Sequence, residues 1–164
     1  MASAKVDSVE RVRQALAEKG LAASVRELSQ STRTAQEAAA TVGCAVAQIV
    51  KSLVFRGTGS GRPVLALVSG ANRVSETLLS RALGEPVGRA DAAFVRERTG
   101  FAIGGVAPVG HKEPPVVIID RDLLSHPLLW AAAGSPFSVF QVTPSDLQRI
   151  TGGTVADLAE RPPA

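Results

Sequence analysis

The spacing of hydrophobic positions predicts two helices in the first quarter of the chain. Apolar residues recur at a helical period between Asp7, which is suited to an N-cap, and Gly20, which would end the helix. Thr34 and Glu37 have the spacing of a capping box, and Gly43 supplies the stop for a second helix. Both segments therefore have a start signal, an apolar stripe and an end signal.

The middle of the chain is rich in β-branched residues and predicts strands. Residues 48–57 and 62–70 flank a glycine-rich turn at 58–61, which indicates a hairpin. The unbroken apolar run of the second strand indicates burial on both faces. Further extended segments are expected at 24–28, 115–120, 128–134 and 137–142.

Helices are expected to surround these strands, at 75–84, at 91–100 and from Thr143 onward. Strands and helices do not alternate strictly, which favours an α+β fold with a mixed, β-barrel-like core flanked by helices over a doubly wound fold. The length of 164 residues is typical of one domain, so residues 1–164 are expected to form a single domain. The tail at 160–164 is expected to be frayed.

The charge of the chain permits a phosphate-bearing partner without requiring one. The net charge is +3, and 14 of the 18 basic residues are arginine. Aromatic residues make up only 4% of the chain, which disfavours an aromatic-rich stacking surface for single-stranded nucleic acid.

The residues that usually bind metals are too few and too scattered to predict a metal site. Cys44 is the single cysteine, and neither His111 nor His126 has the spacing of a metal-binding motif. We expect no metal and no cofactor. The N-terminus lacks an apolar signal region and no run has the length of a membrane span, so a cytoplasmic protein is expected, with neither a membrane nor DNA as partner.

Lys51 is the most informative side chain. Strand alternation places it on one face with the apolar residues Ile49, Leu53 and Phe55. A charge on an apolar face is costly unless it is paired or reaches water. Two interpretations stay open: the stem packs at an edge while the ammonium reaches solvent, or the cation forms the wall of a pocket that faces an anionic or carbonyl ligand.

A second candidate is the glycine-rich segment TGFAIGGVAPVGHKEPP at 99–115. Gly104 and Gly105 can adopt a positive φ, and Pro108 would stiffen the turn. Successive N–H groups there could bind an anion or a carbonyl oxygen, although a plain connecting loop is the alternative. The spacing matches neither a P-loop nor a dinucleotide-binding fingerprint.

The other polar residues have simpler interpretations beside their functional ones. Gly134 and Ser135 form either a hairpin turn or a second wall of the same pocket. His111 could act as an acid or base, but a solvated loop histidine is favoured, and Asp120 is interpreted as a helix cap. Cys44 is interpreted as a buried filler. No nucleophile–base pair is found, so an enzyme of this composition would need a labile substrate.

Five segments in order resemble the YbaK/EbsC/ProX family of aminoacyl-tRNA deacylases, which also supplies the editing domain of bacterial prolyl-tRNA synthetases. The resemblance covers residues from about 30 to 158, and its most specific parts are the lysine of the apolar strand and the TGFAIGGVAPVGH segment. The five segments are AVAQIVKSLVFR, LALVSGANRVS, RADAAFVRERTGFAIGGVAPVGH, PVVIID and AGSPFSVFQVTPSDLQRITGG.

The resemblance implies trans-editing, the hydrolysis of the ester bond between a small, wrongly attached amino acid and the 3′ end of a tRNA, typically tRNA(Pro). Prolyl-tRNA synthetase is a further implied partner. By position, Lys51 matches the family's pocket lysine, and Gly104, Gly105 and Pro108 match a Gly-xxx-Pro loop whose amides bind the aminoacyl group. The neighbouring residues expected to contact substrate are Ser52, Val106, Ala107, Gly134 and Ser135.

Two departures from the family pattern leave the edited amino acid unassigned. Cysteine-specific members carry Arg followed by Asp in the second loop, whereas GSPFSVF has no charge here. Alanine-specific members commonly have Asn after the pocket lysine, where this chain has Ser52. Two alternatives to the deacylase remain: a non-catalytic module of the same fold that binds tRNA or nucleotide, and an unrelated hydrolase that uses His111.

Overall fold

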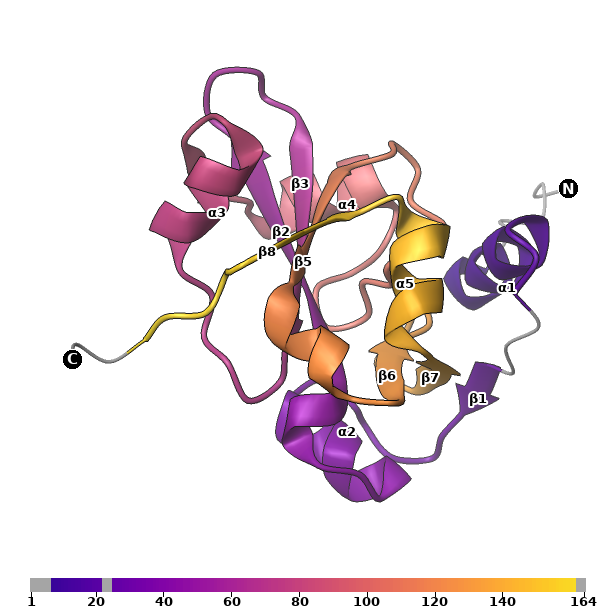
Figure 1. Ribbon diagram of the computed structural model, residues 1–164. Helices are drawn as coiled ribbons and strands as arrows, with labels where there is room; N and C mark the ends of the chain where they lie inside the picture. The colour runs from indigo at the N-terminus through magenta and orange to yellow at the C-terminus, as the bar shows by residue number, and fades with distance from the viewer. Residues whose placement is uncertain (1–6, 22–24, 162–164) are drawn as a thin grey trace, which may run out of the picture.

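A mixed eight-stranded sheet runs through the molecule, and helices lie around it (Figure 1). The computed structural model describes residues 7–21 and 25–161. The strands are β1 (Val25–Glu27), β2 (Ile49–Gly57), β3 (Pro63–Ser69), β4 (Val87–Arg89), β5 (Val116–Asp120), β6 (Leu129–Ala132), β7 (Ser138–Val142) and β8 (Thr154–Ala156). The helices are α1 (Ser8–Glu18), α2 (Ala35–Val42), α3 (Glu76–Leu83), α4 (Ala92–Thr99) and α5 (Pro144–Thr151), with 3₁₀ turns η1 (Val46–Gln48) and η2 (Arg121–Ser125).

The predicted helix ends are confirmed. The Asp7 carboxylate accepts the Val9 N–H at 3.0 Å and caps α1. Thr34 and Glu37 form a reciprocal capping box at the start of α2, with bonds of 3.1 and 3.2 Å. Gly43 ends α2 in the left-handed conformation, with φ of 77°. Local capping chemistry thus sets these boundaries.

The predicted hairpin and the mixed α+β class are also confirmed. β2 and β3 pair antiparallel from Val50↔Ser69 to Arg56↔Pro63, and every residue of β3 is buried. The sheet order is β1-β7-β6-β2-β3-β5-β8, with β4 paired to β2 outside this path. Of the expected segment 24–28, residues 25–27 form β1, and residue 24 lies outside the described ranges.

The second edge of β2 is paired only at its two ends. β6 pairs with it in parallel at Ile49 and Val50, and β4 pairs with it antiparallel from Phe55 to Gly57. Between these pairings, residues 51–54 have no strand neighbour on that edge among the described residues. This stretch is called the open edge below.

Backbone directions identify which groups reach the open edge. Ile49 C=O accepts the Gly70 N–H at 2.7 Å, and the Gly57 N–H donates to Arg62 C=O at 3.0 Å, so odd-numbered residues of β2 bond toward β3. Because these directions alternate along a strand, Ser52 and Val54 present their N–H and C=O groups to the open edge.

The side chains of the hairpin belong to two different apolar clusters. Leu67, which pairs with Ser52, belongs to a cluster that includes residues of α1 and α5. Val68, which pairs with Lys51, belongs to a second cluster with Leu79 of α3. Lys51 and Ser52 therefore face different halves of the core.

The C-terminal segment is more ordered than predicted. The Ser75 N–H donates to Leu158 C=O at 2.6 Å, and the Glu160 N–H donates to Arg73 C=O at 2.7 Å. Arg161 pairs with Asp122 at 3.1 Å. The expected fraying is wrong at residues 160–161, because the buried Leu158 anchors them, and residues 162–164 lie outside the described ranges. β4 and β8, each three residues long, were not predicted.

Candidate functional site

A cavity of about 860 Å³ follows the open edge of β2. Its walls come from β2, the start of α2, residues 103, 104 and 106, β6 and the segment after β3. Of the predicted site residues, Lys51, Ser52, Gly104 and Val106 line it. This cavity is therefore the candidate active site.

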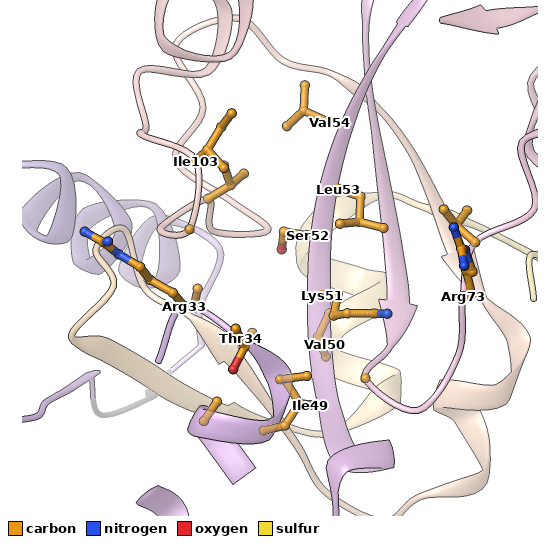
Figure 2. Close-up of a pocket in the computed structure, with 18 of the residues that line it drawn as sticks. Arg33, Thr34, Ile49, Val50, Lys51, Ser52, Leu53, Val54, Arg73 and Ile103 are labelled. Carbon is orange, nitrogen blue, oxygen red and sulfur yellow. The ribbon is translucent and has the colours of Figure 1, made fainter. Parts of the chain in front are cut away.

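Lys51 and Ser52 enter the cavity from opposite sides of β2. Figure 2 shows the Lys51 side chain on the side of Leu53 and Arg73, and Ser52 on the side of Val54 and Ile103. The cavity reaches both sides because no strand closes the open edge. The sequence places Lys51 on its apolar face correctly, but its ammonium projects away from the glycine-rich loop.

A polar network holds the Lys51 ammonium in place. Its Nζ donates to the main-chain oxygen of Asn72. The Asn72 Nδ2 group donates to Asp120 Oδ2 at 2.9 Å and to Asp122 Oδ2 at 2.8 Å. Asp120 is 1% exposed and also accepts the Ser69 N–H at 3.1 Å. Burial lowers the pKa of Lys51, and the Asp120 charge opposes that shift.

Asn72 is the functional candidate that sequence reasoning missed. Its signal is a polar residue directly after a buried strand, which is also the signal of an ordinary turn. The interpretation of Asp120 as a cap is confirmed, since Oδ1 accepts the Asp122 N–H at 3.0 Å at the start of η2. The same carboxylate anchors Asn72, a role that its position at the end of a strand does not reveal.

Ser52 contributes a hydroxyl without a partner. Its Oγ is buried and forms no hydrogen bond within the described residues. A buried hydroxyl left unpaired costs about 1–3 kcal/mol. The hydroxyl lies on a side chain that lines the cavity, so a bound molecule could supply the missing partner.

The glycine-rich loop forms the wall on the Ser52 side. Gly104 has φ of 93° and packs against the Arg33 stem, while Ile103 at the rim is 61% exposed. The Gly105 N–H donates to Ala102 C=O at 3.0 Å, so this amide is not free for a ligand. The N–H groups of Gly104, Val106 and Ala107 form no hydrogen bond with the described residues.

Gly105, Ala107 and Pro108 are buried and do not line the cavity. Gly105 packs against the second loop, because a Cβ there would lie 2.9 Å from Ser135 Cα. Gly134 and Ser135 lie in the hairpin turn that connects the antiparallel strands β6 and β7, and Ser135 packs against the first loop at Gly105. None of these five residues lines the cavity, and the substrate contacts expected of them stay a prediction.

His111 also supports the loop from behind. Its Nε2 lies 2.6 Å from Ala107 C=O and must carry the proton, because a carbonyl oxygen can only accept. Its Nδ1 is buried without a partner among the described residues. Burial lowers the pKa of His111, the bond to Ala107 opposes this, and Arg11 lowers it further. The favoured interpretation as a solvated histidine is wrong, because the ring packs edge-on against Phe101.

Two further properties of the described residues concern metal binding and membrane-spanning helices. Nowhere in residues 7–21 and 25–161 do three or more His, Cys, Asp or Glu side chains gather in a way that could hold a metal ion. In the same residues, no helix has the length and apolar character needed to cross a membrane.

Cys44 is half-buried, and burial raises the pKa of its thiol.

Comparisons with known proteins show what the chain is similar to. The family described as aminoacyl-tRNA editing domain matches residues 29–150. The crystal structure of a "putative trans-editing enzyme for prolyl tRNA synthetase" superposes with a TM-score of 0.88 at 49% identity, covering 98% of this chain and 100% of that chain.

Two curated relatives are more distant. The uncharacterized protein YwhH of Bacillus subtilis (strain 168) is 32% identical over 127 residues, which are 77% of this chain and 80% of YwhH. The proline–tRNA ligase of Limosilactobacillus fermentum is 30% identical over 102 residues, which are 60% of this chain but 18% of the ligase.

Proposed function

The chain belongs to the aminoacyl-tRNA editing domain family, and we propose that it is a trans-editing deacylase for tRNA(Pro) that carries a small, wrongly attached amino acid. The observation that carries this proposal is the cavity at the open edge of β2, which main-chain donors line on one side of the strand and Lys51 lines on the other. Prolyl-tRNA synthetase is the proposed partner, in keeping with the ligase relative and the trans-editing neighbour.

The acyl group is assigned to the Ser52 side of the cavity. Val50, Val54 and Val106 line it there and leave room for a small side chain. The unpaired N–H groups of Gly104 and Val106 and the open-edge N–H of Ser52 can donate to the ester oxygen. Fixed donors of this kind stabilise the negative charge that develops on that oxygen as water attacks.

Hydrolysis needs no activated protein nucleophile in this scheme. The oxygen of water bonds to the carbonyl carbon, the bond to the ribose oxygen breaks, and the ribose oxygen takes up the proton that the water gives up. The α-ammonium of the substrate already activates its ester. Lys51 adds a positive charge from the other side of β2. This charge stabilises the anionic intermediate and attracts the negatively charged RNA backbone.

The test is a release assay on tRNA(Pro) charged with alanine, cysteine, serine or proline. We expect release from at least one mischarged species, and Lys51→Ala should lower kcat about tenfold, because its charge acts from the other side of β2 and not through a direct hydrogen bond to the ester. Lys112→Ala, an exposed lysine outside the cavity, is the matched control. If the whole panel stays intact, the deacylase proposal fails. Salt-dependent tRNA binding without release would support the binding module instead.

A further inference from the structure

A second, smaller cavity of about 320 Å³ lies at the β4 end of β2. Its lining residues are Arg56, Arg89, Ala90, Asp91 and Phe94, and it is called the arginine pocket below. Arg89 and Ala90 also line the first cavity, so the two spaces are neighbours that share a wall.

The two arginines of this pocket have no acidic partner. Neither guanidinium forms an ion pair with any described residue. By contrast, Arg62 nearby lies 3.1 Å from Glu85. The carboxylate of the pocket, Asp91, accepts the Phe94 N–H at 2.8 Å and caps α4, so it is directed to the helix. The pocket therefore keeps a surplus of positive charge.

The sheet also leaves room beside Arg56. Its partner on β4 is Gly88, which has no side chain to cover that face. Strand alternation puts Arg56 on the same side of β2 as Ser52 and Val54, the side assigned to the acyl group. Arg56 is four positions after Ser52, about 13 Å along the strand at 3.3 Å per residue. A group bound at Arg56 thus lies beyond the ester.

We propose that the arginine pocket binds the single-stranded nucleotide that precedes the aminoacylated terminal nucleotide of the tRNA. Arg56, on the acyl side of β2, binds its phosphate, since a planar guanidinium group matches phosphate oxygens with paired hydrogen bonds. Arg89 pairs with Phe55 and so starts from the Lys51 side of the sheet, from where it adds positive charge to the pocket. The Phe94 ring provides a surface on which the base stacks. Arg98 lies 4.9 Å over the Phe94 ring centre, which leaves one ring face for this purpose. This proposal rests on the proposed function and extends it to the RNA.

The experiment measures binding of a CCA trinucleotide and of uncharged tRNA(Pro) over a salt series. For the double variant Arg56→Gln/Arg89→Gln we expect both dissociation constants to rise about tenfold, and the slope of log K against log salt to become shallower by about 0.7, the value for one lost phosphate contact on a single strand. Phe94→Leu should weaken binding of the trinucleotide without changing the slope of log K against log salt.

The matched control is Arg13→Gln/Arg81→Gln, which removes the same charge from residues outside both cavities. The proposal is overturned if this control weakens binding equally, because net charge then explains the effect. It is also overturned if only full-length tRNA is affected, because the arginines then contact the body of the tRNA. Unchanged unfolding temperatures would show that the variants are folded.

A third measurement separates this proposal from the proposed function. Hydrolysis of a minimal aminoacyl-adenosine, which lacks the preceding phosphate, should be the same in wild type and the double arginine variant. If no aminoacyl ester is cleaved but binding of the trinucleotide still depends on the two arginines, the deacylase proposal fails and the proposal for the arginine pocket stands. If esters are cleaved and RNA binding does not depend on the two arginines, the proposal for the arginine pocket fails and the deacylase proposal stands.

Discussion

At the scale of single residues, the position of Lys51 depends on Asn72. The Asn72 main-chain oxygen accepts from the ammonium, and its side chain is fixed by Asp120 and Asp122. An amide is the suitable group between two carboxylates, because it can donate one N–H to each. Asn72 therefore acts as a positioning residue for the lysine.

Replacing Asn72 should reduce editing without removing any group that lines the cavity. We expect Asn72→Ala to lower kcat about tenfold and to cost about 1–3 kcal/mol of stability, because Asp120 Oδ2 and Asp122 Oδ2 each lose one of their two donors. Asn72→Asp should be worse, since like charges within one cluster repel. The kinetic split between kcat and KM tests this, because a purely structural role would leave kcat per folded molecule unchanged.

His111 makes the stability of the loop depend on pH. Its pKa in the folded protein lies below the ordinary value of 6.5, so the unfolded chain binds the proton more readily. The stabilising contribution is complete above pH 6.5 and is lost as the pH falls below it toward the folded pKa.

The measurement for His111 is the unfolding temperature between about pH 7.5 and pH 5, a range that spans the titration of histidine. His111→Gln keeps an N–H donor for Ala107 but does not titrate. The wild type should therefore lose more thermal stability than the variant as the pH falls. Parallel curves for the two proteins would contradict the role assigned to His111.

At the scale of elements, the two loops are packed without space for a side chain. The backbone angle φ of Gly105 is compatible with alanine, but the added Cβ would lie 2.9 Å from the backbone of Ser135. We expect Gly105→Ala to destabilise the protein by about 1–3 kcal/mol, the cost of overpacking, and to reduce editing by displacing the loop. Gly59→Ala is the control, because its nearest contact is a flexible Glu85 oxygen at 3.5 Å.

Sequence patterns predicted the helices and strands more accurately than their packing against one another. Capping at Thr34 and the apolar run of β3 are local signals, and both were read correctly. The side of β2 that the glycine-rich loop occupies depends on which strands pair across a long stretch of chain. Local periodicity therefore placed Lys51 on its face but could not place the loop on the opposite side.

At the scale of the whole molecule, the C-terminal segment holds one wall of the candidate site in place. Leu158 is 0% exposed, and its main-chain oxygen holds Ser75, which lines the cavity with Arg73. Residues distant in sequence thus hold the wall on the Lys51 side in place. Editing should respond to changes made far from the reacting ester.

Leu158→Ala tests this dependence. The cavity left behind should cost about 2–5 kcal/mol of stability, as for other buried leucines. The editing rate should fall more steeply than the folded fraction, because the segment at 73–75 loses its anchor. Thr154→Ala, an exposed change in β8, should leave both quantities close to wild type.

The open edge of β2 also constrains how such a protein can diversify. Lys51 and Ser52 are neighbours in the chain but serve opposite halves of the substrate space. One inserted or deleted residue within β2 would rotate every later side chain to the other face. New specificities must therefore arise by exchange of residues in place, and the length of this strand is expected to stay fixed while the loops around it vary.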